Sequence, residues 1–196
     1  MKKVVQIRYN PPMIFILFLL CYLIGSFPSA YFLSKMIAHR NIFELGDKNG
    51  GARNVYHSVG QKIGILTFLF DFSKGILIWS IGLHFKLTDM LLFATLFFAW
   101  LGHCFPIWLR GKGGKGVAVI IGFTAPQYIL SSILSVFIFF GLRKWIKNFD
   151  LLYTVTVLLF LLILVISKIS FFRLTMVSVM FLLPLTKNIF IKQKRE

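Results

Sequence analysis

A glycine- and lysine-rich segment near the middle of the chain has the composition of a phosphate-binding loop. It reads Arg110-Gly-Lys-Gly-Gly-Lys-Gly116, the GKGGKG loop, and is followed at once by an apolar run. Glycines let backbone amides approach a ligand closely. A following helix adds free N–H groups and the positive end of its dipole. With the charges of Lys112 and Lys115, the segment is suited to binding an anion such as phosphate.

The GKGGKG loop fits neither common nucleotide-binding motif. Gly111, Gly113 and Gly116 have G-x-G-x-x-G spacing, but an apolar block precedes them where a dinucleotide-binding fold would have a strand. The Walker pattern fails because Gly116 is followed by Val117, where that pattern requires Lys. A positively charged turn beside lipid headgroups therefore remains an alternative to a phosphate site.

A second segment combines glycine, cations and amides in the same way. It reads Gly46-Asp-Lys-Asn-Gly-Gly-Ala-Arg-Asn-Val55 and is called the asparagine loop below. Asparagine side chains both donate and accept hydrogen bonds. Two loops suited to binding phosphate indicate two anionic ligands, or one ligand with two anionic groups. This favours a reaction that takes place between the two loops.

Three ionisable residues interrupt the apolar blocks. Asp71 and Lys74 are three residues apart, so a helix would place them on one face, where they can pair. Ions inside a membrane are costly unless they are paired or face water, which makes them functional candidates. His103 comes shortly before the GKGGKG loop and is a candidate ligand or proton relay. The alternatives are a structural ion pair and a histidine that only packs between helices.

The composition requires an integral membrane protein. Of 196 residues, 58% are apolar and only 14% are charged, with a mean hydropathy of +0.82. A helix needs about 20 residues to cross the hydrocarbon core, and six apolar blocks approach that length: Met13–Leu33, Ile63–Leu83, Met90–Leu109, Val117–Leu142, Leu151–Ile166 and Phe171–Ile191. No nucleic-acid partner is expected from the net charge of +16, because the cations sit in short gaps between these blocks, where they anchor helices at lipid headgroups.

Two of these blocks are irregular. Gly25-Ser-Phe-Pro28 interrupts the first block, and backbone groups freed by such a break must find partners inside the protein, so the helix is expected to face a polar cavity. The fourth block contains Pro126 and is either a kinked helix or a helix with a re-entrant piece. We therefore expect an all-α bundle of about six or seven transmembrane helices, one of them broken or re-entrant.

The two loops are expected on the same side of the membrane. Two crossings separate the asparagine loop from the GKGGKG loop, so both face one aqueous compartment. If six crossings are assumed, eleven Lys and Arg residues lie on one side and ten on the other. The positive-inside rule then assigns no orientation.

Five short segments together resemble the bacterial acyl-phosphate:glycerol-3-phosphate acyltransferases. They are Tyr22-Leu-Ile-Gly-Ser26, Gly46–Gly60, Asp71-Phe-Ser-Lys-Gly75, Gly102-His-Cys-Phe-Pro106 and Gly111–Ala118. The resemblance implies transfer of a fatty acyl group from acyl phosphate to the 1-hydroxyl of glycerol 3-phosphate, giving lysophosphatidate for phospholipid synthesis. It also implies a multi-pass protein of the bacterial inner membrane, with its active site facing the cytoplasm and with no metal and no cofactor.

Carried over to this chain, the resemblance implies one acyltransferase-like domain over residues 1–196 and a set of site residues. The expected catalytic residues are Asn49, His103 and Lys115. The expected substrate- and phosphate-binding residues are Ser26, Lys48, Gly50, Gly51, Arg53, Asn54, Lys74, Lys112, Gly113, Gly114, Gly116, Ser170 and Asn188. Partners are the two substrates and membrane lipids, and the sequence does not indicate an oligomeric state.

The asparagine loop departs from the family pattern. Asp47, Lys48 and Arg53 stand where the family has Ser, Gly and Thr, which changes both the charge and the reach of the side chains. Two other functions therefore stay open. One is a divergent paralogue that binds phosphorylated or acylated ligands with a changed acceptor or no activity, and the other is an anion transporter.

Overall fold

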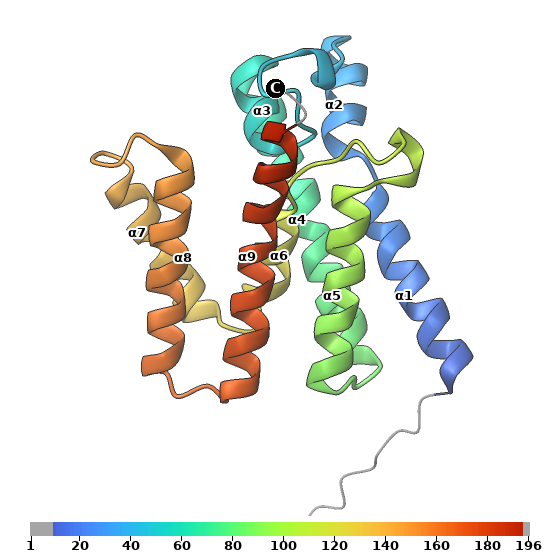
Figure 1. Cartoon of the computed structure of the whole chain (residues 1–196), viewed down its shortest axis with the longest axis vertical. Coiled ribbons are helices and arrows are strands. Elements are labelled where there is room, and N and C mark those ends of the chain that lie inside the picture. Colours follow the sequence, from blue (N-terminus) through green and yellow to red (C-terminus); the bar gives the residue numbers. More distant parts are fainter. Residues whose placement is uncertain (1–9, 194–196) are drawn as a thin grey trace, which may run out of the picture.

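The computed structural model describes residues 10–193, with side chains described as far as Leu185. Helices and their connecting loops make up this part of the chain (Figure 1). In chain order the helices are α1 (Pro11–Ser26), α2 (Ser29–Ala38), η1 (Ile42–Glu44), α3 (Ala52–Ser58), α4 (Gln61–His84), α5 (Asp89–Cys104), η2 (Ile107–Leu109), α6 (Val117–Thr124), α7 (Ile129–Leu142), α8 (Phe149–Ile166) and α9 (Phe171–Gln193).

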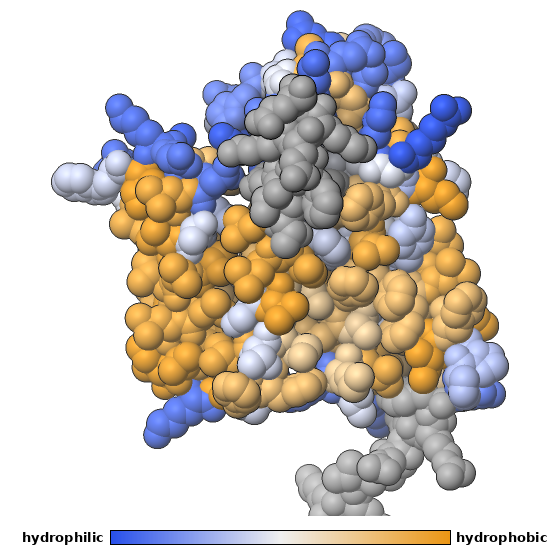
Figure 2. Space-filling model, viewed as in Figure 1, coloured by the Kyte–Doolittle hydropathy of each residue, from blue (hydrophilic) through white to orange (hydrophobic). Residues whose placement is uncertain are grey.

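The surface has the pattern of a membrane protein. Figure 2 shows a broad hydrophobic band between two hydrophilic ends. Four helical stretches are long and apolar enough to cross a bilayer, and two shorter apolar helices lie in α7 and in the described part of α9. The four stretches are Pro11–Ala38, Gln61–His84, Asp89–Leu109 and Phe149–Ile166. The predicted all-α membrane bundle is therefore confirmed.

The first apolar block forms two helices, as its interruption predicted. α1 begins at Pro11, a favoured residue for the first turn of a helix. It ends at Ser26 because Pro28 disfavours helical geometry in the residue before it. α2 then starts at Ser29 and closes on His39 in a left-handed conformation. The break brings the backbone of Phe27 and the side chain of Ser29 to the interior.

The fourth apolar block also forms two helices, α6 and α7. Of the two predicted forms, it is the helix with a re-entrant piece. α6 has only eight residues, so it is about 12 Å long against a hydrocarbon core of about 30 Å. The chain turns at Pro126, and α7 runs back to the end of the molecule that carries the glycine-rich loops (Figure 1). The prediction of one broken or re-entrant segment is confirmed.

This reversal corrects the predicted division of positive charge. Because α6 and α7 enter and return, the connection between α7 and α8 lies at the same end as the two loops (Figure 1). The side chains that the structure describes then place eleven cations at that end: Lys35, Arg40, Lys48, Arg53, Lys62, Arg110, Lys112, Lys115, Arg143, Lys144 and Lys147. Only three lie at the opposite end, namely Lys86, Lys168 and Arg173. The near-equal split was wrong because it assumed that residues 117–142 cross once.

Glycines allow the helices that support the loops to pack closely. α1 packs along α5, and α4 packs along α6. At Gly75 in α4, an added Cβ would overlap the carbonyl of Val119 and crowd the backbone of Phe123. Gly25 of α1 lies equally close to the backbone of Ala99 in α5. Such small residues let membrane helices meet backbone to backbone, where no hydrophobic effect drives association.

Gly75→Ala should therefore destabilise the protein, because α6 would have to move as a backbone. Over-packing of this kind costs about 1–3 kcal/mol, which would appear as a lower melting temperature in detergent. Gly141→Ala is the matched control, since nothing lies within 4 Å of a Cβ at that position. Equal melting temperatures for the two variants would contradict the close α4–α6 packing.

Candidate functional site

The two glycine-rich loops touch one another at one end of the molecule. The carbonyl oxygen of Gly50 lies 2.8 Å from the position of a Cβ on Gly114. A Cβ on Gly50 would lie 3.3 Å from the carbonyl carbon of Gly113. The predicted placement of both loops on one side is therefore confirmed, and their backbones are in direct contact.

The GKGGKG loop is folded back against the end of α5. The amide of Gly114 donates a hydrogen bond to the carbonyl of His103 at 3.2 Å, and the indole N–H of Trp100 donates to the carbonyl of Lys115 at 3.0 Å. Gly116 has a φ of 81° and precedes the first residue of α6. This left-handed conformation favours glycine, and it lets the loop lead directly into a helix N-terminus.

The asparagine loop is held in shape by the side chain of Asn54, which is buried. Its Oδ1 accepts hydrogen bonds from the amide of Asp47 at 3.0 Å and the hydroxyl of Ser58 at 3.1 Å. Its Nδ2 donates to the carbonyls of Leu45 and Asn49, both at 3.0 Å. The amide of Asn54 is thus occupied in closing the loop, so we assign it a supporting role in place of the predicted substrate contact.

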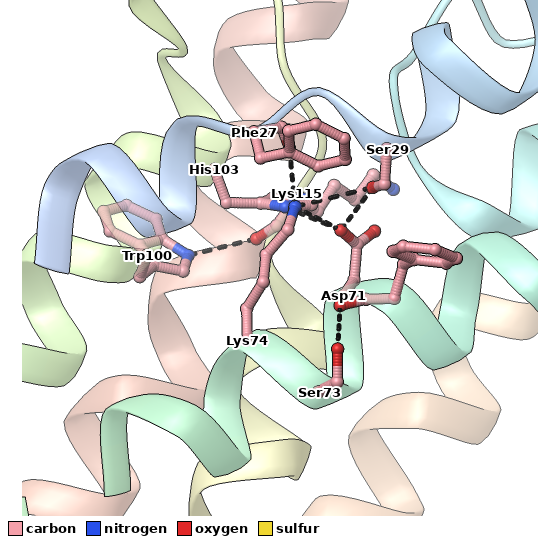
Figure 3. A network of polar contacts seen from close by, with 9 residues as sticks. Phe27, Ser29, Asp71, Ser73, Lys74, Trp100, His103 and Lys115 are labelled. Carbon is pink, nitrogen blue, oxygen red and sulfur yellow. Dashed lines mark hydrogen bonds and ion pairs between the residues drawn. The ribbon is translucent and has the colours of Figure 1, made fainter. Parts of the chain in front are cut away.

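A buried polar network lies beneath the loops, where α1, α2, α4 and α5 meet (Figure 3). Asp71 Oδ1 accepts from Lys74 Nζ at 2.7 Å and from the hydroxyl of Ser29. Lys74 also donates to the carbonyl of Phe27 at 2.6 Å, which the α1–α2 break leaves without a helical partner. His103 Nδ1 lies 3.5 Å from the same Asp71 oxygen. The network connects the α1–α2 break to the histidine.

Asp71→Ala should unfold the protein more readily, because it leaves the ammonium of Lys74 buried without its counter-ion. Removing one partner of a buried pair costs about 3–5 kcal/mol. The double variant Asp71→Ala/Lys74→Met removes both charges and should recover most of the melting temperature. If the double variant melts no higher than the single one, the two charges are not paired.

A small cavity lies between the loops and the network. Its polar lining comes from Ser29, Gly50, His103, Lys112, Gly113 and Gly114, and its apolar lining includes Phe27, Phe43 and Leu109. The space that the centre of a water molecule can occupy is about 10 Å³, close to the minimum for a single water.

Five of the predicted site residues line this cavity: Gly50, His103, Lys112, Gly113 and Gly114. Asn49 Oδ1 and Ser26 Oγ are buried and have no hydrogen-bond partner within the described part of the chain. Gly51 and Gly116 precede the first residues of α3 and α6, and Lys48 is exposed with a φ of 52°. Lys74 belongs to the buried network, where it pairs with the protein itself.

Two predicted cations point toward α8. The guanidinium of Arg53 lies 4.4 Å from the ring centroid of Phe149, and Lys115 Nζ lies 3.9 Å from Asp150 Oδ1. Neither residue is among those that line the small cavity. Arg53 instead borders an open cavity of about 300 Å³, together with Asp47, His57 and other asparagine-loop residues.

The position of Ser170 contradicts its prediction as a substrate-binding residue. It lies in the connection between α8 and α9, at the end of the molecule opposite the two loops (Figure 1). There its hydroxyl accepts a hydrogen bond from the amide of Arg173 at 3.4 Å. The prediction was wrong because the α6–α7 reversal puts this connection on the other side. Asn188 lies outside the side chains that the structure describes.

Ser29 was missed by the sequence reasoning. Its hydroxyl bonds to Asp71 and it lines the cavity beside His103. The signal was the interruption at Gly25–Pro28, which predicted a polar cavity but did not indicate which hydroxyl would face it.

Comparisons with known proteins agree on one family. Residues 15–193 match the family model described as glycerol-3-phosphate acyltransferase. A glycerol-3-phosphate acyltransferase of Ehrlichia ruminantium (strain Welgevonden) is 40% identical over 107 residues, 55% of this chain and 54% of the relative. One of Syntrophotalea carbinolica is 37% identical over 134 residues, 67% of each chain. The matched part of the chain thus spans about half to two thirds of these relatives.

Solved structures show the same fold. The crystal structure of PlsY, an integral membrane glycerol 3-phosphate acyltransferase, in its glycerol 3-phosphate form superposes with a TM-score of 0.79 at 26% identity, covering 92% of each chain. The lysophosphatidic acid form of the same protein gives a TM-score of 0.77, with the same identity and coverage.

Proposed function

Because the chain belongs to the glycerol-3-phosphate acyltransferase family, we propose that it transfers a fatty acyl group from acyl phosphate to the 1-hydroxyl of glycerol 3-phosphate. The products are lysophosphatidate and inorganic phosphate. The observation that carries the proposal is the contact between the asparagine loop and the GKGGKG loop around a cavity lined by His103. It provides adjoining amides and cations for two anionic substrates.

The reaction needs alignment and charge stabilisation more than a strong nucleophile. The hydroxyl oxygen attacks the acyl carbonyl carbon, a carbon–oxygen ester bond forms, and the bond to the phosphate oxygen breaks with its electron pair. The hydroxyl proton leaves to the departing phosphate or to His103. Acyl phosphate is already activated, so holding the two substrates together supplies much of the rate.

Each proposed site residue has a role in the reaction that follows from its charge and its position. Lys112 and Lys115 of the GKGGKG loop stabilise negative charge on the phosphate. Asn49, whose buried amide oxygen has no hydrogen-bond partner in the described part of the chain, is the proposed acceptor for a polar group of the substrate. Asp71 lies 3.5 Å from His103 Nδ1 and orients the ring, which leaves Nε2 beside Gly114. Of these groups, Lys112 and His103 line the small cavity between the loops.

The active site faces the cytoplasm of a bacterial inner membrane in this proposal. Cytoplasmic segments of membrane proteins carry an excess of Lys and Arg. Eleven described cations lie at the end with the glycine-rich loops and three lie at the other end. The asymmetry supports this orientation.

The proposal is tested with protein purified in detergent and supplied with palmitoyl phosphate and glycerol 3-phosphate. We expect release of phosphate and formation of lysophosphatidate in equal amounts. Phosphate flux across proteoliposomes without ester formation would show an anion transporter and contradict the proposal.

One observation favours a second candidate, an enzyme with a changed acceptor. Asp47 and Arg53 stand where the family resemblance leads one to expect Ser and Thr, and both border the open cavity of about 300 Å³. A carboxylate and a larger cation there alter which hydroxyl compound fits. Ester formation with another phosphorylated alcohol, but none with glycerol 3-phosphate, would establish this candidate.

A further inference from the structure

The start of α8 contacts both glycine-rich loops. Phe149 packs under the guanidinium of Arg53 from the asparagine loop, at 4.4 Å from the ring centroid. The next residue, Asp150, lies 3.9 Å from Lys115 Nζ of the GKGGKG loop. Two consecutive residues therefore reach two segments that are separated by more than fifty positions in the sequence.

Both residues are held by their own hairpin. Asn148 Oδ1 accepts hydrogen bonds from the amides of Asp150 and Leu151 at 3.0 and 3.1 Å, which caps the first turn of α8. The ring of Phe149 packs edge-on against Phe139 of α7, with centroids 6.1 Å apart. The tip of the α7–α8 hairpin thus presents a fixed ring and a fixed carboxylate to the loops.

These two contacts with Arg53 and Lys115 join the hairpin to the loops. α7 packs mainly against α8, and α8 packs against α7 and α9. The GKGGKG loop is held against α5, and the asparagine loop is closed by Asn54 of α3. The two loops contact each other through the backbone at Gly50, Gly113 and Gly114. Contacts from α8 to both Arg53 and Lys115 would limit how far these two residues can move apart.

We propose that Phe149 and Asp150 are positioning residues that clamp the asparagine loop to the GKGGKG loop and hold Lys115 in reach of the acyl phosphate. The inference rests on the proposed acyltransferase function. It also explains Arg53, where the family resemblance leads one to expect Thr: the longer side chain reaches the ring of Phe149. The clamp is therefore a feature of this chain's own residues.

The experiment measures kcat and KM for Asp150→Asn, Phe149→Leu and the double variant. One exposed ion pair and one cation–π contact are each modest. We expect each single variant to raise the KM for palmitoyl phosphate about threefold and the double variant about tenfold, with melting temperatures unchanged. Asp150→Glu and Phe149→Tyr keep the charge and the ring and should retain wild-type KM.

Trp145→Leu is the matched control. Trp145 lies in the same tip and is 85% exposed. We expect wild-type kinetics from this variant. A role confined to folding would instead lower the melting temperature and the active fraction of the clamp variants while leaving KM unchanged, and that result would overturn the proposal.

Two further results would overturn the clamp. A lower KM for Asp150→Asn would show that the carboxylate competes with the substrate for Lys115.

The second readout does not depend on turnover: spin labels at Lys48→Cys and Trp145→Cys report the distance between the asparagine loop and the tip of the α7–α8 hairpin. The natural Cys21 and Cys104 are buried. The distance distribution should broaden in the double variant. An unchanged distribution contradicts the clamp, whereas absent turnover in the wild type contradicts only the proposed function.

Discussion

Lys115→Ala should lower kcat/KM for acyl transfer by about 10²–10³-fold, the loss typical of removing one group that stabilises developing negative charge. The departing phosphate gains charge as the ester forms, and the ammonium of Lys115 stands at the end of the loop proposed to hold it. The measurement is phosphate release from palmitoyl phosphate in the presence of glycerol 3-phosphate. Melting temperatures should stay close to wild type, because the side chain of Lys115 is partly exposed.

Lys86→Ala is the control for Lys115. Lys86 lies between α4 and α5, at the end of the molecule opposite the two loops (Figure 1). The substitution removes the same charge from the chain but not from the site, so activity should be unchanged. If the two variants lose activity equally, the loss reflects overall charge and the assignment of the GKGGKG loop is wrong.

Gly114→Ala should reduce kcat/KM by at least about 100-fold, because displacing reacting groups by about 1 Å has an effect of that size. A Cβ on Gly114 would lie 2.8 Å from the carbonyl oxygen of Gly50 and would overlap the imidazole of His103. Neither the backbone of the asparagine loop nor the buried ring can yield without changing the cavity. One methyl group therefore pushes apart the three parts that the site brings together.

Gly60→Ala tests whether that loss is specific. Gly60 follows the asparagine loop at the start of α4, and the nearest atom to a Cβ there is 4.0 Å away. This variant should keep wild-type activity. Near-normal turnover by Gly114→Ala would mean that the loops do not approach each other during catalysis as they do in the structure.

The membrane architecture followed from local sequence properties. Apolar run length predicts a helix wherever backbone groups must be satisfied without water, and this predicted α4, α5 and α8 to within a few residues. Pro28 and Pro126 marked the two interruptions because proline disfavours helical geometry in its neighbourhood. Whether the chain at Pro126 would continue or reverse is not a local property, since it depends on whether α6 finds α4 to pack against.

That reversal decided which candidates share a site. Ser170 was predicted as a binding residue from the family resemblance, yet it lies at the far end of the molecule because α6 and α7 enter and return (Figure 1). The same reversal brings the tip of the α7–α8 hairpin, with Phe149 and Asp150, to the loops. Each helix starts on the side of the membrane where the previous one ended. One wrongly predicted reversal therefore changes the side assigned to every later segment.

The sequence by itself determined that this protein lies in the membrane and that its GKGGKG and asparagine loops lie on one side of it, while anion binding by these loops stays a prediction. These properties depend on residue type, run length and the number of crossings between two nearby segments. Only the tertiary structure decided that Asn54 supports its own loop, that Lys74 also donates to the carbonyl of Phe27, and that Gly114 lies against Gly50 and His103. Such contacts join residues up to about sixty positions apart, and they form only where helices pack closely enough to bring those backbones together.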